Sequence, residues 1–544
     1  MGKNKKITPP EQRLPFHLPA APSYALLAVI LIFFAVIRLR LVNLPLERDE
    51  GEYAYAGSLI LHGLAPYQLC YTMKLPGTAL SYALIEALFG RSPAAIHLGL
   101  LFANSAAIVL IYFLARRLFA SPAALVASAS FALLSIEPSI LGFAAHAAQF
   151  VALAALAGIL LLLRAQESAR LWPFFLSGLV LGVAFLMKQP GIFFILFAIL
   201  WTLYSGWRRN LPLRPRILEP LVLLLGSILP FAATCLILWR MGIFSRFWLW
   251  TFSYALQYGS ETPFSIGLRL LWSSGSSVIG SAPLIWLLAA AGLVALYRDP
   301  QTRPHFPFLA SLLLFSFVAV CPGLYFRGHY FVMMFPAISL LCAAAIKAGS
   351  NLLLEFESTR AWSALPVAVF LFCLVISVGQ QSNFLFTSDS PALFRSLYAG
   401  NPFAEALPIS DYIKAHSSPQ DRIAVIGSEP EIYFYSDRLS ATGYIYMYPL
   451  TEVQPFASSM QRDMISEIKA CHPRFVVFVD SPPSWLTRDK SDRTIFQWSG
   501  RYTSQYRLAG IVDILGDHTE YHWSDAATYQ PRSLFRVYLY DRGP

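Results

Sequence analysis

The sequence predicts a polytopic α-helical membrane protein that ends in a smaller α/β domain. Of its 544 residues, 56% are hydrophobic and only 13% are charged, whereas soluble domains carry about 25% charged residues. Long apolar runs fill most of the first 380 residues, and from about residue 381 onward these runs shorten and polar residues become frequent. We therefore assign residues 1–380 to a transmembrane module and residues 381–544 to a separate domain.

The transmembrane module is expected to contain about eleven helices, because a span needs about 20 predominantly apolar residues. The runs that qualify, or nearly do, centre on residues 24–42, 94–115, 122–141, 143–163, 172–187, 190–206, 217–239, 276–297, 305–322, 331–346 and 361–380. Arg38 and Arg40 follow the first run, where a signal peptide would have a small-residue cleavage site. We therefore interpret this run as a retained span.

The basic residues indicate how the helices are oriented. If the N-terminus is cytoplasmic, every cytoplasmic loop is basic, as the positive-inside rule requires. These loops contain Arg116, Arg117, Arg164, Arg170, Arg208, Arg209, Arg214, Arg216, Arg298, Arg303, Lys347 and Arg360. An odd number of spans then places residues 381–544 outside the cytoplasm. The same distribution explains the net charge of +10, so nucleic acid is not expected as a partner.

Residues 381–544 are numerous enough to form their own core. Short β-rich runs predict strands at 422–426, 475–479 and 535–540, and residues 460–470 have a helical pattern. The aromatic runs YFY and YIYMY in this region are able to stack on sugar rings. Alternation of aromatic residues in strands and core explains them more simply, and we prefer that interpretation.

The first segment expected outside, residues 43–92, is longer than a connection requires, and so is a second one, residues 241–275. The first begins with four acidic residues, Glu47, Asp49, Glu50 and Glu52. Acids grouped in this way raise each other's pKa or bind a cation, and either property suits base catalysis or metal binding. A solvated turn that caps a helix N-terminus explains the same pattern.

Four basic or imidazole side chains are expected at the same level of the outer face. Lys74 in MKLPG and Lys188 in LMKQPG suit phosphate binding or a polar cavity, but a lysine that snorkels to the interface is an equal alternative. Arg327 and His329 lie in CPGLYFRGHYFVMMFP. An outward arginine is unusual under the positive-inside rule and its fork suits phosphate, whereas a lone histidine is more often structural. This grouping fits an enzyme that acts on a phosphorylated substrate in the membrane.

Four motifs in this order, RDEGEYAYAGSLILHG, MKLPG, LMKQPG and FRGHYFVMMFP, resemble the GT-C superfamily of membrane glycosyltransferases. The resemblance is to bacterial members of the protein-mannosyltransferase group, glycosyltransferase family 39, which includes aminoarabinose transferases. The segment that starts NPFAEALPISDYIKAH resembles the external domain of such members. The resemblance implies a GT-C fold in the plasma membrane, the inner membrane of a bacterium. It also implies transfer of a hexose or pentose from a polyprenyl-phosphate donor to a glycan, lipid or protein acceptor.

The resemblance also implies roles for single residues. Asp49 matches the general base that deprotonates the acceptor hydroxyl in an inverting reaction, and Glu50 matches the acid that positions it or the sugar. Lys74 matches the lysine that holds the donor phosphate. The other residues expected to bind the donor or substrate are Arg327, His329, Glu52, Tyr53 and Lys188.

Two departures from the pattern concern a metal. Some relatives have a metal-binding glutamate before the first-loop lysine, where this chain has Met73. An acid found in relatives after the third or fourth span is replaced in GFAAHAAQF, which offers only His146 and Gln149. No cofactor is therefore certain, the metal ligands are unknown, and a divalent metal stays open.

Two other classes of function are compatible with a polytopic membrane protein. A transporter or flippase of lipid-linked sugars would use the acids as a gate, but it needs polar residues near the bilayer midplane, and here they gather at the outer edge. A scaffold that keeps the fold without activity is the third class, and the intact Asp49–Glu50 pair and Lys74 argue against it.

Overall fold

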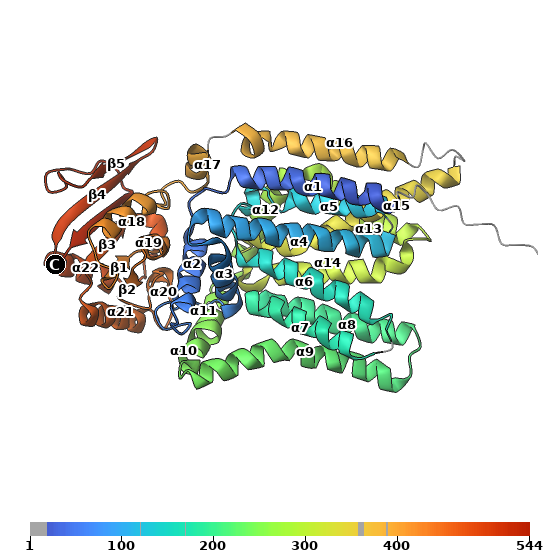
Figure 1. Cartoon of the computed structure of the whole chain (residues 1–544), viewed down its shortest axis with the longest axis horizontal. Helices are drawn as coiled ribbons and strands as arrows, with labels where there is room; N and C mark the ends of the chain where they lie inside the picture. The colour runs from blue at the N-terminus through green and yellow to red at the C-terminus, as the bar shows by residue number, and fades with distance from the viewer. Residues whose placement is uncertain (1–18, 120, 169, 357–363, 388–389, 544) are drawn as a thin grey trace, which may run out of the picture.

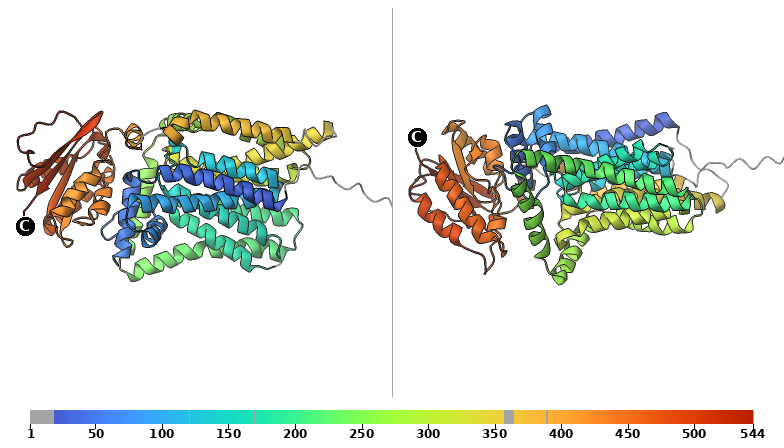
Figure 2. Two further views of the ribbon diagram at one scale, coloured as in Figure 1. Left: turned by 45° about the horizontal axis from the view of Figure 1, so that its top comes forward. Right: turned by 90° about the horizontal axis from the view of Figure 1, so that it is seen from below.

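The computed structural model describes residues 19–119, 121–168, 170–356, 364–387 and 390–543. Long helices form a bundle, and a six-stranded sheet domain lies at one end of it (Figure 1). The two further views in Figure 2 keep the sheet domain at the same end. The predicted fold class, a polytopic helical protein with a C-terminal α/β domain, is confirmed. The domain boundary at residues 380/381 stays a prediction, and Arg360 lies outside the described residues.

Seven helices in the described part of the chain are long and apolar enough to cross a membrane. Four of them are α1 (Ala20–Arg40), α4 (Pro93–Phe119), α6 (Ala147–Ala165) and α9 (Leu213–Arg240). The other three include a 3-10 turn before the α-helix: Gln189–Arg208 with α8 (Ile192–Arg208), Arg303–Val320 with α14 (Phe306–Val320), and Gly328–Glu355 with α15 (Phe335–Phe356). Three shorter apolar helices accompany them, α5 (Ser121–Leu134), α7 (Trp172–Met187) and α16 (Leu365–Gln380). The short helices have 14 or 16 residues, fewer than a span usually needs. The expected number of eleven spans is therefore not confirmed.

The apolar run at 276–297, expected to form one span, is broken into two helices. Helix α12 (Phe264–Ser281) and helix α13 (Pro283–Arg298) meet there at 100°. Ala282 between them is non-helical, with φ −146° and ψ 60°. Pro283 then opens α13, because proline is well suited to the first turn of a helix and disrupts a helix interior.

Both segments that the sequence analysis treated as long external connections are largely helical. Residues 43–92 form α2 (Arg48–Leu61) and α3 (Pro76–Phe89). Residues 241–275 form α10 (Phe244–Trp248), the π-helical turn η3 (Leu249–Tyr254), α11 (Ala255–Ser260) and the first part of α12. Figure 1 shows α2, α3, α10 and α11 between the bundle and the sheet domain. These helices form a layer that joins the two parts.

The C-terminal domain is a mixed sheet with the strand order β2-β1-β3-β6-β4-β5. Its strands are β1 (Arg422–Ile426), β2 (Leu439–Ser440), β3 (Phe475–Asp480), β4 (Arg507–Leu515), β5 (His518–His522) and β6 (Arg536–Asp541). The three strands predicted from sequence correspond to β1, β3 and β6, and the predicted helix lies within α21 (Ala457–Cys471). Strands β1, β2 and β3 run parallel, while β6 is antiparallel to both of its neighbours.

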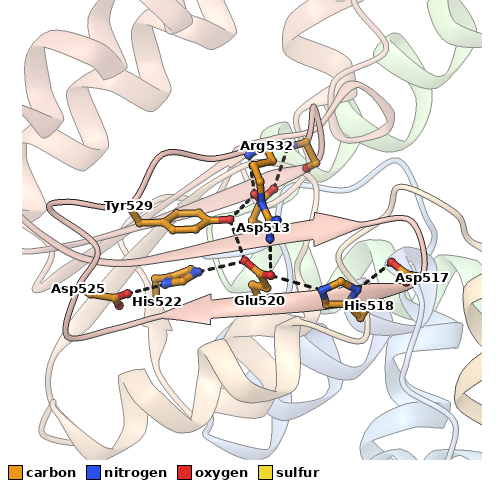
Figure 3. A network of polar contacts seen from close by, with 9 residues as sticks. Asp513, Asp517, His518, Glu520, His522, Asp525, Tyr529 and Arg532 are labelled. Atoms are coloured by element: carbon orange, nitrogen blue, oxygen red, sulfur yellow. Dashed lines mark hydrogen bonds and ion pairs between the residues drawn. The ribbon is translucent and has the colours of Figure 1, made fainter.

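A network of polar side chains covers the far edge of this sheet, on β4, β5 and the segment before β6 (Figure 3). Asp513 accepts hydrogen bonds from the Tyr529 hydroxyl (2.8 Å) and the Arg532 backbone N–H (2.7 Å). Glu520 on β5 pairs with Arg532 and accepts a hydrogen bond from Tyr529 (3.0 Å). These contacts hold the connection between β5 and β6 against the edge of the sheet. An edge strand that is covered in this way is protected from pairing with strands of other chains.

The sheet domain is attached to α2 by buried polar contacts and by close packing. Arg48 on α2 forms an ion pair with Glu429 (Nη2–Oε1 3.1 Å) and donates hydrogen bonds to the Ser428 carbonyl and the Tyr448 hydroxyl (both 2.6 Å). A Cβ atom at Gly51 would lie 2.6 Å from the backbone nitrogen of Glu431, at the start of helix α19 (Glu431–Ser436). Only glycine permits this close approach of α2 to the domain.

Helices α7 and α9 pack through glycine in the same way. A Cβ atom at Gly178 would lie 2.0 Å from the Leu223 carbonyl oxygen, and one at Gly226 would lie 2.2 Å from the Phe175 carbonyl oxygen. Small residues of this kind let helix backbones approach each other where lipid supplies no hydrophobic driving force.

Replacing Gly178 by alanine is expected to destabilise the bundle. The added methyl group forces α7 and α9 apart, and overpacking of this kind costs about 1–3 kcal/mol. We expect a lower apparent Tm of the detergent-purified protein. Gly280→Ala is the matched control, because a Cβ atom there meets nothing within 4 Å and alanine favours a helix. Equal Tm values for the two variants would contradict the close approach of α7 to α9.

Replacing Glu429 by glutamine is expected to loosen the sheet domain from α2. The buried guanidinium of Arg48 loses its carboxylate, and breaking one side of a buried pair costs about 3–5 kcal/mol. Limited proteolysis of the detergent-purified protein should release the C-terminal domain sooner. Asp437→Asn is the control, because it disrupts the more exposed pair of Asp437 with Arg91, which also joins the two parts and contributes at most about 1 kcal/mol. Equally fast cleavage of the two variants would argue against Arg48 as the principal anchor.

Candidate active site

The N-terminus of α2 carries the predicted acidic residues and is held in place by them. A capping box closes this end, in which Glu47 accepts a hydrogen bond from the Glu50 backbone N–H (3.0 Å) and Glu50 accepts one from the Glu47 backbone N–H (3.3 Å). The expected helix cap is therefore present at Glu47 and Glu50, but the turn is buried and not solvated. Glu50 also accepts a hydrogen bond from the Ala145 backbone N–H (2.7 Å) and shares one with the Nε2 of His97 (3.2 Å). These contacts fix the start of α2 against the bundle.

Asp49 points in a different direction, into a cavity of about 810 Å³ between the bundle and the sheet domain. Its side chain is mostly buried, with the Lys74 Nζ and the His146 Nδ1 each 3.9 Å from Oδ2. Burial alone would raise the pKa of Asp49, but Lys74 and the other nearby positive charges lower it to about 2. The carboxylate is therefore ionised at neutral pH.

Three basic side chains line the same cavity, Lys74, Lys188 and Arg327. Lys188 comes from the end of α7, and its Nζ lies 3.6 Å from the centre of the Tyr330 ring. Arg327 precedes the turn η6 (Gly328–Met334), and its Nη2 donates a hydrogen bond to the Tyr258 hydroxyl (3.4 Å). Burial and the neighbouring charges of Lys74 and Arg327 hold the pKa of Lys188 well below its usual value, so Lys74 and Arg327 carry most of the positive charge around Asp49.

The other predicted site residues do not all lie in the large cavity with Asp49. Glu52 lines the large cavity with Asp49, and burial raises its pKa to about 7. Glu50 lines neither of the cavities described here. Tyr53 lies behind Lys74, with its ring 5.7 Å from Nζ and packed edge-on against Tyr82. His329 lines a second, smaller cavity.

This second cavity, of about 340 Å³, adjoins the first, and Asp49, Arg327 and Tyr446 line both. His146, His329, Asn401 and Phe403 are among its other lining residues. The bundle and the C-terminal segment therefore enclose it together.

Within the described residues, Asp49, His146 and His329 form a group that could hold a metal, with one potential ligand atom of each lying within 4.8 Å of the others. The two imidazole rings, however, are stacked, with centroids 4.0 Å apart and planes 13° apart. A histidine binds zinc through a ring nitrogen about 2.0–2.1 Å from the ion. Because that lone pair lies in the ring plane, two parallel rings do not direct their lone pairs at one ion. This stacked arrangement of His146 and His329 does not fit a metal centre.

Sequence reasoning missed several residues of the site. Tyr446, Tyr448 and Glu452 come from the C-terminal domain and line the large cavity, and Glu452 accepts a hydrogen bond from Tyr254 (2.6 Å). The tyrosines belong to the YIYMY run, for which we preferred a place in the core. His146 was noted only as a substitute for an absent acid. No local pattern distinguishes these residues from packing residues.

Comparisons with known proteins bear on the fold and the family. Residues 74–239 match the family model described as dolichyl-phosphate-mannose-protein mannosyltransferase. No curated protein matches the chain in sequence.

Several solved structures are similar to most of the chain, and two of them are described here. One is ArnT from Cupriavidus metallidurans bound to undecaprenyl phosphate, with a TM-score of 0.55, 17% identity and coverage of 97% of this chain and 99% of that one. The other is the oligosaccharyltransferase AglB from Archaeoglobus fulgidus in complex with an inhibitory peptide and a dolichol-phosphate, with a TM-score of 0.51, 14% identity and coverage of 94% and 75%. The chain therefore shares the fold of these two membrane proteins, and its residues 74–239 are similar to the protein-mannosyltransferase family.

Proposed function

We propose that the protein transfers a sugar from a polyprenyl-phosphate donor to an acceptor hydroxyl at the outer face of the membrane, with Asp49 as general base. The observation that carries the proposal is the buried carboxylate of Asp49 in one cavity with Lys74, Lys188 and Arg327. The similar structures of ArnT and AglB contain undecaprenyl phosphate and a dolichol-phosphate, which supports a lipid phosphate as the donor group.

The reaction is an inverting displacement at the anomeric carbon. The acceptor oxygen forms a bond to that carbon while the bond from the carbon to the phosphate oxygen breaks, and the lipid phosphate leaves with the electron pair. Asp49 takes the proton of the acceptor hydroxyl, as a general base does. The negative charge that develops on the phosphate is stabilised by cations placed for it in advance, here Lys74, Lys188 and Arg327.

Donor binding makes Asp49 a better base. Without a substrate, Lys74 and its neighbouring cations hold the pKa of Asp49 at about 2, which makes its carboxylate a weak proton acceptor. An anionic phosphate bound among the same cations offsets their charge, and a nearby negative charge raises the pKa of a carboxyl group. Asp49 therefore becomes a stronger proton acceptor when the donor is bound.

The remaining predicted residues have supporting roles in this proposal. Glu50 orients the turn that carries Asp49 through its hydrogen bonds to the bundle. Glu52, whose pKa of about 7 leaves much of it protonated near neutral pH, is able to donate a hydrogen bond to a sugar hydroxyl. Tyr53 supports Lys74 from behind.

The position of the charged residues favours an enzyme over a transporter or flippase. Asp49 and Glu52 lie on α2, in the layer between the bundle and the sheet domain, and Lys188 follows the last residue of α7. A transporter places its substrate site near the middle of the spans.

The Asp49→Asn variant is expected to abolish glycosyl transfer, with a loss of about 10²- to 10⁴-fold, the usual contribution of a general base. The product is first identified as the surface glycan or glycolipid lost when the gene is deleted, and each variant is then scored by how much of this product it restores. Asp411→Asn, on the exposed face of helix α18 (Ala406–Ala415), is the matched control and should restore it fully. If Asp49→Asn, inserted in the membrane at the normal level, also restores it, Asp49 is not the base.

The sheet domain is expected to lie outside the cytoplasm. The basic ends of α4, α6, α8 and α13 are the predicted cytoplasmic ends, and Figure 1 shows the connection from α8 to α9 at the end of the bundle opposite the sheet domain. Alkaline phosphatase, which is active only outside the cytoplasm, should be active when fused after residue 544 and inactive when fused after Arg209. The reverse pattern would overturn the assignment of faces.

A further inference from the structure

We propose that the smaller cavity beside Asp49 is the acceptor site and that it takes a sugar unit, so that the acceptor is a carbohydrate hydroxyl. This inference rests on the proposed function and deepens it by naming the acceptor class. It depends on how the two cavities share Asp49 and on the polar groups that line the smaller one.

Asp49 borders both cavities, as transfer requires. A general base must reach the acceptor hydroxyl within hydrogen-bond distance, while that oxygen lies close to the anomeric carbon of the donor. Asp49, Arg327 and Tyr446 line both cavities. Two substrates bound on either side of these residues would therefore meet at the carboxylate.

The lining residues distinguish the two cavities. Lys74 and Lys188 line the large cavity and not the small one, so the excess positive charge that suits a phosphate belongs to the donor side. In the small cavity, Arg48 is already paired with Glu429, and the negative charge of Asp49 lies beside the positive charge of Arg327. Burial and the neighbouring acids hold the pKa of Glu47 well above its usual value, so the cavity has no excess of positive charge. An anionic acceptor group is therefore not favoured there.

Unpaired polar atoms in the small cavity call for a hydroxylated ligand. His146 is buried and neither of its ring nitrogens has a hydrogen-bond partner in the described structure, and the buried hydroxyl of Tyr398 is also unpaired. Buried polar groups in native proteins nearly always have partners, because leaving them unpaired is costly. Burial lowers the pKa of His146 to about 4, so the neutral ring offers one donor and one acceptor. The hydroxyl groups of a sugar supply both complementary functions.

The size and the walls of the cavity also fit one sugar unit. Its volume of about 340 Å³ lies at the lower end of the range for small-molecule sites, about 300–1,000 Å³, and an extended peptide would need more room. The aromatic rings of Phe403 and Tyr446 provide apolar surface for the carbon-bound face of a sugar ring. Both residues come from the C-terminal segment, so this segment would select the acceptor.

The test measures binding of three kinds of probe to the full-length protein in detergent. Methyl pyranosides of glucose, mannose, galactose and arabinose represent the sugar acceptor, a serine-containing pentapeptide represents a protein acceptor, and undecaprenyl phosphate occupies the large cavity. Saturation-transfer NMR gives a Kd for each probe. We expect at least one pyranoside to bind saturably and the peptide not to bind.

Tyr398→Phe removes only the unpaired hydroxyl and is expected to weaken pyranoside binding about fivefold, the effect of one hydrogen bond of about 1 kcal/mol. Its affinity for undecaprenyl phosphate should be unchanged, which also shows that the variant is folded. Tyr529→Phe, in the network at the far edge of the sheet, is the matched control and should change neither affinity.

The proposal is overturned if no pyranoside binds saturably, if Tyr398→Phe binds pyranosides normally, or if the peptide binds and loses affinity in Tyr398→Phe. Failure of the proposed function gives a different result. In that case undecaprenyl phosphate does not bind to the unaltered protein, and the pyranoside measurements still decide the nature of the small cavity.

Discussion

The structure of the site depends on the way in which the first turn of α2 is held from two sides. Three consecutive residues make contacts in three directions. Glu50 is hydrogen-bonded to His97 and Ala145 of the bundle, and Arg48 binds the sheet domain through Glu429. Asp49 between them faces the cavity. The helix cap that explains the acidic motif locally is therefore also what aims the proposed base, so the structural and catalytic interpretations of this motif are compatible.

The second constraint is electrostatic. Lys74, Lys188 and Arg327 surround Asp49 in a partly dehydrated cavity, and like charges gathered in such a place are costly unless something offsets them. A bound phosphate would offset them, and it would return Asp49 toward the proton affinity of an ordinary carboxylate. In the proposed reaction, the same charges couple binding of the donor to activation of the acceptor. If one of these basic residues were removed, the cavity would bind the phosphate less tightly. Donor binding would then also raise the pKa of Asp49 by a smaller amount.

The sequence predicted the parts of this arrangement that leave a local signal. Asp49, Lys74, Lys188 and Arg327 are charges next to long apolar runs, so they stand out, and the apolar runs themselves indicated the helices. The bend at Ala282 was missed because the apolar pattern continues through it. Glu429 is 381 residues away from Arg48, and no periodicity reveals such a partner. Tyr446 was missed for another reason, since an aromatic residue in a core and one that lines a cavity have the same local sequence pattern.

The contact between the sheet domain and α2 gives that domain a part in the chemistry. Tyr446 lines both cavities, while Arg48 donates a hydrogen bond to Tyr448, two residues further along the chain. The anchor that holds the domain on α2 therefore lies beside a tyrosine that separates the proposed donor and acceptor. Any shift of the domain would move Tyr446 with respect to Asp49, because Asp49 is held in place by the hydrogen bond between its neighbour Glu50 and the bundle. Transfer needs the reacting groups to be held in a fixed relative position. The buried Arg48–Glu429 pair fixes the position of the sheet domain where the two cavities meet.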